Sequence, residues 1–390
     1  MEYLKLKELF TIKKGNKVEQ VEEFEEAENL LRYIQIDDLR NDKNKKYCYY
    51  NSKYIIAKEE DLIIAWDGAN AGTIGYGLNG AIGSTLSLLK LNNSEFNTKY
   101  CGMFLKSKFK YLRDNCTGAT IPHISRSSLE DLKIPKLTLE NQNKIVEVLD
   151  KAQELIDKRK GQIEALDELV KSRFIEMFGT PMEKRFIGKT LPEIIAADKY
   201  ALKRGPFGGS LKKDDFIQEG YLVYEQRHAI HNDFDYAKYY ISKDKYDEMI
   251  MFKVDPKDLL VSCSGVTLGR ISEVPDGAKE GIINQALLKI TLNQNIMNNI
   301  YFMQLFRNEQ IQDKLFGFSR GSGIPNFPSM NEVKAMEFLC PPIELQNQFA
   351  DFVKRVDKLK FKMEKSLKEL EDNFNSLMQK AFKGELFKED

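Results

Sequence analysis

The chain contains an internal repeat. Three segments occur twice in the same order, at offsets of 197, 203 and 204 residues: Asp61–Ile74 with Asp258–Ile271, Gly118–His123 with Gly321–Asn326, and Leu139–Asn143 with Ile343–Asn347. Offsets that grow slowly along the chain indicate one duplicated unit that carries small insertions. The repeat therefore predicts two similar domains within the 390 residues.

Each copy of the repeat has the same internal plan. Short β-rich runs and short helical segments come first: Asp61–Ala65, Leu86–Leu91 and Lys99–Asn115 in one copy, and Asp258–Ser262, Ile282–Ile290 and Ile300–Phe316 in the other. A long helical pattern follows, after Pro135 in the first copy and after Pro341 in the second. We expect an α+β fold with mixed α/β domains at residues 1–138 and 181–342, and long helices at 139–180 and 343–390.

Both long helical segments carry an apolar seam with alternating four-residue and three-residue steps. Its positions are Ile145, Leu149, Ala152, Ile156, Arg159, Ile163, Leu166, Val170, Arg173 and Met177, and then Phe349, Val353, Val356, Lys360, Met363, Leu367, Leu370, Phe374, Leu377 and Ala381. This heptad spacing keeps one stripe of a helix facing a partner helix. The sequence therefore predicts an antiparallel coiled coil and an approximate twofold axis between the two copies.

Charge and composition restrict the function. The chain has 59 basic and 59 acidic residues, so nucleic acid would have to be bound locally or together with a partner, not by bulk charge. No apolar run approaches the ~20 residues of a membrane span, and the five cysteines are scattered singly. We expect a cytoplasmic protein without membrane contact.

The sequence lacks the sequence motifs of ATP-binding phosphate loops and of amino-methyltransferases. It has no Gly-x-x-x-x-Gly-Lys-[Ser/Thr] phosphate loop and no Asp/Asn-Pro-Pro-aromatic motif of amino-methyltransferases. His228 and His231 have the spacing of one helical face, but the glutamate and the third ligand of a zinc site are absent. We therefore expect no catalytic site, no metal and no cofactor on this chain.

At this point the chain resembles the specificity subunits of type I restriction-modification systems. The resemblance lies in Arg204–Lys213, Asp258–Gly265, Gly281–Leu287 and the helix end Ser172–Gly179, while the first domain lacks the Gly-Pro-Phe-Gly loop of the second. It implies two target-recognition domains that direct adenine methylation. It also implies two methyltransferase subunits bound largely through the helices, a restriction and translocation subunit, and S-adenosylmethionine, ATP and Mg on these partners.

Candidate DNA contacts follow from residue type and from neighbouring glycines. For phosphate they are Lys203, Arg204, Ser210, Lys212 and Lys213 around Gly205–Gly209, and Lys13, Lys14 and Lys17 in the first domain. For base edges they are Gln226, Arg227 and His228 after the apolar run Tyr221–Tyr224, with Arg270, Arg320, Asn70 and Arg126. Surface turns with solvated lysines, and surface salt bridges, are the alternative interpretations.

Two further interpretations concern the repeat. Gly118–His123 and Gly321–Phe327 recur in both copies, so we expect them to brace each domain against its helix. In the leading hypothesis the two domains bind separated half-sites on duplex DNA, and helix length sets the spacer. The alternative is a scaffold whose two domains bind protein or carbohydrate.

Overall fold

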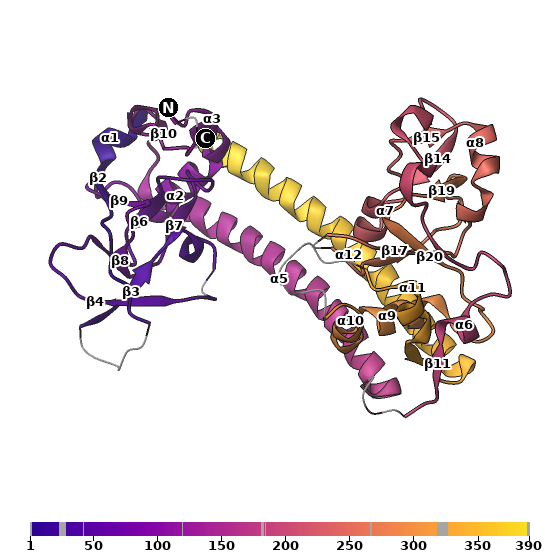
Figure 1. The fold of residues 1–390 in the computed structure, drawn as a ribbon. Helices are drawn as coiled ribbons and strands as arrows, with labels where there is room; N and C mark the ends of the chain where they lie inside the picture. Colours follow the sequence, from indigo (N-terminus) through magenta and orange to yellow (C-terminus); the bar gives the residue numbers. More distant parts are fainter. Residues whose placement is uncertain are drawn as a thin grey trace. The chain divides into compact units, whose positions relative to one another are not determined.

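The computed structural model describes residues 2–22, 29–41, 43–118, 120–180, 183, 185–265, 267–317 and 327–387. The chain divides into two compact units (Figure 1). Unit 1 comprises residues 1–162 and 363–390, and unit 2 comprises residues 163–362. The two long helices, α5 (Leu139–Phe178) and α12 (Ile343–Lys383), therefore contribute to both units.

Unit 1 contains two four-stranded sheets and one two-stranded pairing, with strand orders β2-β9-β6-β7, β4-β3-β8-β5 and β1-β10. In the second of these sheets β3 and β8 are parallel. Its elements before α5 are β1 (Tyr3–Lys5), α1 (Leu6–Leu9), β2 (Phe10–Lys14), β3 (Leu30–Ile34), η1 (Ile36–Leu39), β4 (Lys46–Tyr49), β5 (Ile56–Ala57), β6 (Leu62–Ala65), β7 (Ile74–Tyr76), β8 (Gly80–Ile82), β9 (Leu86–Leu91), α2 (Thr98–Ser107), α3 (Phe109–Asp114), α4 (Arg126–Glu130) and β10 (Lys133–Pro135).

Unit 2 repeats this plan with the orders β12-β20-β17-β18, β13-β15-β14-β19-β16 and β11-β21, and here β14 and β19 are parallel. Its elements are β11 (Gly188–Thr190), α6 (Leu191–Ile194), β12 (Leu202–Arg204), η2 (Gly208–Ser210), η3 (Lys213–Asp215), β13 (Phe216–Ile217), β14 (Tyr221–Tyr224), α7 (Gln226–His231), β15 (Tyr240–Ile241), α8 (Lys243–Glu248), η4 (Ile250–Phe252), β16 (Lys253–Val254), β17 (Leu259–Ser262), β18 (Ile271–Glu273), β19 (Gly281–Ile283), β20 (Leu287–Ile290), α9 (Asn299–Arg307), α10 (Glu309–Phe316), α11 (Met330–Ala335) and β21 (Glu337–Leu339).

The two long helices run antiparallel within each unit. In unit 1 the start of α5 shares a core with the end of α12, and Lys160 forms an ion pair with Glu371 at 2.9 Å. In unit 2 the end of α5 packs on the start of α12, with the rings of Phe174 and Phe349 5.5 Å apart. Every predicted seam position is buried or partly buried, so the heptad spacing identified the packed faces correctly.

One glutamine fastens each long helix to its unit. The buried side chain of Gln142 donates to the carbonyls of Glu95 and Leu137 and accepts from the backbone N–H of Asn97 at 2.7 Å. In unit 2, Gln346 makes the same set of three bonds to Ile296, Pro341 and Asn298. The repeated Gln-Asn pair of the sequence is thus a helix anchor.

Three predicted elements are divided in the structure. The helix predicted at Lys99–Asn115 breaks into α2 and α3 at Lys108, and the one at Ile300–Phe316 breaks into α9 and α10 at Asn308. The Asn308 side chain accepts from the N–H of Gln310, and such a cap starts a new helix. The run Ile282–Ile290 contains a turn at Asn284 between β19 and β20. Among the described residues, no helix is both long and apolar enough to cross a membrane.

Candidate nucleic-acid interface

In unit 2, several strands end at one edge. Strands β14 and β19 are parallel, so both lead out of their sheet on the same side. Strands β12 and β17 are both antiparallel to β20 and end beside its first residues. Gly205 joins these ends, since a Cβ built on it would lie 1.8 Å from the carbonyl oxygen of Asn284. We call this place, with Arg204, Gly205, Ser264 and Asn284, the unit 2 edge.

Unit 1 has the corresponding edge, formed by Lys14, Gly15, Asp67 and Gly83. Strands β2 and β6 are antiparallel to β9, and β3 is parallel to β8. A Cβ on Gly15 would lie 2.3 Å from the carbonyl oxygen of Gly83, which repeats the close approach of Gly205. Lys14 therefore occupies the place of Arg204. Comparison of the sequences missed this match, because its offset is 190 and not 197 residues.

Arg204 ends β12 with its guanidinium near two aromatic rings. Its Cζ lies 5.4 Å from the ring centroid of Phe207 and 5.0 Å from that of Phe327. Its Nε is buried without a hydrogen-bond partner. The neighbouring Lys203 points to the other face of the strand, as alternation requires, and its Nζ lies 5.2 Å from the Phe252 ring. Only Arg204 of this pair belongs to the edge.

The loop after Gly205 places two more candidates at the surface. Ser210 is exposed and its hydroxyl donates to the carbonyl of Phe207 at 3.1 Å. Lys212 is exposed as well, and its backbone N–H donates to the Asp215 carboxylate at 2.6 Å. The Lys212 ammonium has no ion pair or hydrogen bond with another described residue, so it remains available to an anion.

The prediction of an exposed loop at Gln226–His228 was wrong. These residues start the short helix α7, and His228 is fully buried. Its Nε2 lies 2.9 Å from the carbonyl oxygen of Tyr236, and its Nδ1 accepts from the N–H of Glu225 at 2.9 Å. A ring enclosed in this way is a structural element and does not reach a base.

Gln226 and Arg227 are held by neighbours. The Gln226 amide donates to the carbonyl and the hydroxyl of Ser264, at 3.0 and 2.7 Å, and so links the ends of β14 and β17. Arg227 is exposed, with its Cζ 4.4 Å from the Tyr236 ring centroid and an ion pair to Asp233 at 3.3 Å. Gln226 thus lies on the unit 2 edge and braces it.

Arg270 lies next to this edge. It is exposed and immediately precedes β18, and its backbone N–H donates to the hydroxyl of Ser262 at 3.0 Å. The backbone of Arg270 is held at the end of β17, and its side chain extends to the surface. Arg320 lies outside the described residues.

At the unit 1 edge a carboxylate holds two cationic or titratable side chains. Asp67 is 2.9 Å from Lys14 Nζ and 2.6 Å from His123 Nδ1. Burial by itself would raise the pKa of Asp67, but the hydrogen bonds from His123 and Lys14 outweigh it and lower that pKa. His123 was not among the predicted contacts, although the recurring Ile-Pro-His element contained it.

The other unit 1 candidates are dispersed. Lys13 points away from Lys14 and lines a separate groove with Lys58 and Lys90. Lys17 is exposed, just beyond the edge. Asn70 accepts a hydrogen bond from Arg40, and Arg126 is paired with Glu130 at 2.7 Å along α4. These last two side chains fit the alternative of ordinary surface pairing.

The segment Gly118–His123 packs differently from the expectation. His123 and Thr117 exchange backbone hydrogen bonds, and the N–H of Gly68 donates to the carbonyl of Pro122 at 2.9 Å. These hydrogen bonds join the segment to the turn after β6, next to Asp67. The segment is thus part of the unit 1 edge. Residues 321–326 of the recurring segment in unit 2 lie outside the described residues.

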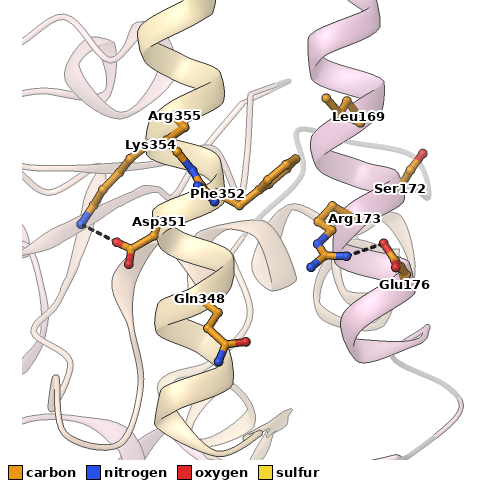
Figure 2. A pocket seen from close by; sticks show the side chains of 9 residues that line it. All are labelled: Leu169, Ser172, Arg173, Glu176, Gln348, Asp351, Phe352, Lys354 and Arg355. Carbon is orange, nitrogen blue, oxygen red and sulfur yellow. Dashed lines mark hydrogen bonds and ion pairs between the residues drawn. The ribbon is translucent and has the colours of Figure 1, made fainter.

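A groove lies between the two long helices of unit 2 (Figure 2). Its volume is about 1120 Å³, and its lining is Leu169, Ser172, Arg173, Glu176, Gln348, Asp351, Phe352, Lys354 and Arg355. Arg173 lies over the Phe352 ring and pairs with Glu176 at 2.7 Å. Within the described ranges, no group of three or more His, Cys, Asp or Glu side chains has metal-binding geometry.

Known proteins are similar to this chain over most of its length. The model of a family described as "Type I restriction modification DNA specificity domain" matches residues 1–168 and 207–372. The specificity subunit of the type I restriction enzyme MjaVIII from Methanocaldococcus jannaschii is 25% identical over 359 residues, which are 86% of this chain and 81% of that protein. The EcoBI specificity subunit from Escherichia coli is 22% identical over 355 residues, 84% of this chain and 74% of that protein.

Two solved structures share the fold. The S subunit of a type I restriction-modification system from M. genitalium matches with a TM-score of 0.55 at 18% identity, over 98% of this chain and 96% of that chain. A chain from a study of complex assembly and conformational transition of the type I R-M system matches with a TM-score of 0.61 at 13% identity, over 99% and 98% of the two chains. The architecture of two mixed α/β units with long helices is therefore common to these proteins.

Proposed function

Because this chain belongs to the type I restriction modification DNA specificity domain family, we propose that its two units bind the two halves of one bipartite DNA target. The role of the chain is DNA sequence specificity, and catalysis lies in partner subunits of the complex. In this proposal unit 1 contacts one half-site, unit 2 contacts the other, and the number of base pairs between them is fixed.

The duplicated edge is the observation that carries the proposal. Each unit brings loops from two sheets together beside one basic strand end, Lys14-Gly15 in unit 1 and Arg204-Gly205 in unit 2. Glycine lets the backbone pass close to its neighbour there, and cations beside it suit the phosphates and base edges of DNA. Two copies of such an edge on one chain fit two half-sites.

The partners follow from membership of a type I complex, which implies DNA and further protein subunits. We assign to them two methyltransferase subunits, which would use S-adenosylmethionine for adenine methylation, and a restriction and translocation subunit that would use ATP and Mg. The long helices, including the groove with Phe352 and Leu169, are the proposed surface for the methyltransferase subunits. The proposed place of action is the cytoplasm.

The proposed domain limits are residues 1–138 and 181–342 for the two target-recognition domains, with helical regions at 139–180 and 343–390. In these terms α5 and α12 set the spacer. Seven residues inserted in each helix would keep the heptad register and add ~10 Å, which is about three base pairs at ~3.4 Å each.

The test is to sequence the methylome of a host that carries the partner genes, with and without this gene. We expect a methylated motif of two short specific halves that depends on the gene. The double insertion should lengthen the spacer and leave both halves unchanged. A gene-dependent motif without a spacer, or an unchanged spacer in a folded insertion variant, would contradict the proposal.

A further inference from the structure

The guanidinium of Arg204 lies near two aromatic rings. Its Cζ is 5.4 Å from the ring centroid of Phe207 and 5.0 Å from that of Phe327. No hydrogen bond or ion pair joins its side chain to another described residue. Because Nε alone among its nitrogens is both buried and unpaired, Nη1 and Nη2 remain accessible. The N–H donors of these two terminal nitrogens are therefore free to bind a ligand.

The position of these donors suits a ligand at the strand ends. Arg204 is the last residue of β12, and the next residue, Gly205, packs on the turn at Asn284. Phe207, in the same loop, is 68% exposed, which is unusual for a large aromatic side chain that also holds a cation. The unit 2 edge is therefore a surface where aromatic and cationic groups are presented together.

The two parallel N–H donors of arginine distinguish a base better than they distinguish a phosphate. A phosphate accepts hydrogen bonds from many directions, so charge and reach are sufficient for it. Guanine presents two acceptors, O6 and N7, side by side in the major groove, and they match two parallel N–H donors of arginine. A guanidinium that already packs against rings loses less conformational entropy when it makes both bonds.

Lys14 provides the contrast at the equivalent place in unit 1. Its ammonium is a compact charge without a fork and is already paired with Asp67. In unit 2 the residue in the position of Asp67 is Ser264, which accepts from Gln226 and carries no charge. The two strand ends are thus equipped for different contacts.

We propose that Arg204 specifies one guanine in the half-site bound by unit 2, through Nη1 and Nη2, and that Phe207 and Phe327 hold it in position. This inference rests on the proposed function of the chain. It concerns one base pair of one half-site and leaves the other half-site and the spacer untouched.

The test compares Arg204→Lys and Arg204→Ala with the natural chain, each assembled with its partner subunits. We expect methylome sequencing to show one guanine position of a single half-site relaxed in both variants. Binding to the natural target should fall about 5- to 150-fold, the range for one bidentate base contact. Arg204→Lys separates the two kinds of contact, because a phosphate contact would survive with lysine.

A probe on the DNA side makes the result independent of folding of the variants. Each guanine of the target is replaced in turn by 7-deazaguanine, which lacks the N7 acceptor. One replacement should weaken binding of the natural complex and have no further effect with Arg204→Ala. If no guanine shows this behaviour, or if Arg204→Ala weakens all sequences equally, Arg204 does not specify a base. Absence of any bipartite target for the natural complex would instead refute the proposed function.

Discussion

Unit 1 and unit 2 share a backbone arrangement and differ in the polar side chains that it carries. The strand registers match Lys14 with Arg204 and Leu88 with Lys289. Equal distances from matched strands pair Asp67 with Ser264 and Asp38 with His228. The glycines at the edges and the glutamine anchors of the helices are the same in both units. A duplicated chain can therefore keep its backbone while its charged and polar contacts, exposed and buried, become different.

Unit 2 has a buried charge pair, Lys289 and Asp258, at a place where unit 1 has leucine. Lys289 and Asp258 are 7% and 1% exposed, with 3.7 Å between Nζ and Oδ2. Leu88 occupies the place of Lys289 in unit 1. We expect Lys289→Leu to destabilise the chain by about 3–5 kcal/mol, because it leaves the Asp258 carboxylate buried without a cation. Denaturant unfolding measures this loss.

The pH dependence of that variant has a definite sign. Burial raises the pKa of Asp258, and Lys289 opposes this shift, so Lys289→Leu should raise that pKa further. A folded-state pKa above the unfolded value favours folding at low pH and is costly at neutral pH. The destabilisation should therefore shrink as the pH falls from 7 toward the usual carboxylate range. The double variant Asp258→Asn/Lys289→Leu should recover part of the stability at pH 7, and an equal cost at both pH values would contradict this account.

Replacing the glutamine anchors tests whether the same backbone arrangement contributes equally to the stability of the two units. Gln142→Leu and Gln346→Leu each remove three hydrogen bonds from buried groups, and we expect each to cost about 2–3 kcal/mol. Lys144→Ala, on the exposed side of α5, is the control. Thermal unfolding with hydrogen exchange in each unit would locate the loss. Markedly unequal costs would show that the two units use the anchor differently.

The sequence predicted the frame better than the edges. Heptad spacing is local, so the seam from Ile145 to Ala381 was correct in every position. The buried ring of His228 contacts the carbonyl of Tyr236, which lies in the loop after α7, and no local pattern shows this contact. The match of Lys14 to Arg204 was hidden by a seven-residue change of offset between β2 and β6. The phosphate and base contacts at both edges stay predictions.

The carboxylate of Asp67 offers a way to make the unit 1 edge resemble that of unit 2. Asp67→Ser would introduce the residue type of Ser264 and release Lys14 and His123. In the proposed function, one anion fewer beside DNA should strengthen binding by about 1 kcal/mol and steepen the salt dependence by about one unit of log–log slope. Binding titrations at several salt concentrations measure both. Weaker binding would mean that Asp67 itself contacts a base.

The low pKa of Asp67 also predicts a small effect on stability. Its hydrogen bonds favour the ionised form in the folded chain. The stabilisation is therefore present above the usual carboxylate pKa and is lost as the pH falls through the lower folded value. Asp67→Ser should accordingly unfold more easily than the natural chain at pH 6, and the difference should vanish in strong acid. Unfolding curves at both pH values are the measurement.

The smallest expected effect concerns a glycine that α5 has and α12 lacks. Gly161 lies inside α5, exposed and with nothing near a Cβ built on it, while α12 has Lys365 at the equivalent place. Glycine inside a helix costs roughly 0.5–1 kcal/mol relative to alanine, so Gly161→Ala should stabilise unit 1 by that amount. Lys365→Ala is the matched control, and we expect almost no change from it because lysine and alanine have similar helix propensities. Thermal unfolding of both variants decides the point: a destabilised Gly161→Ala would mean that α5 uses the freedom of glycine where α12 does not.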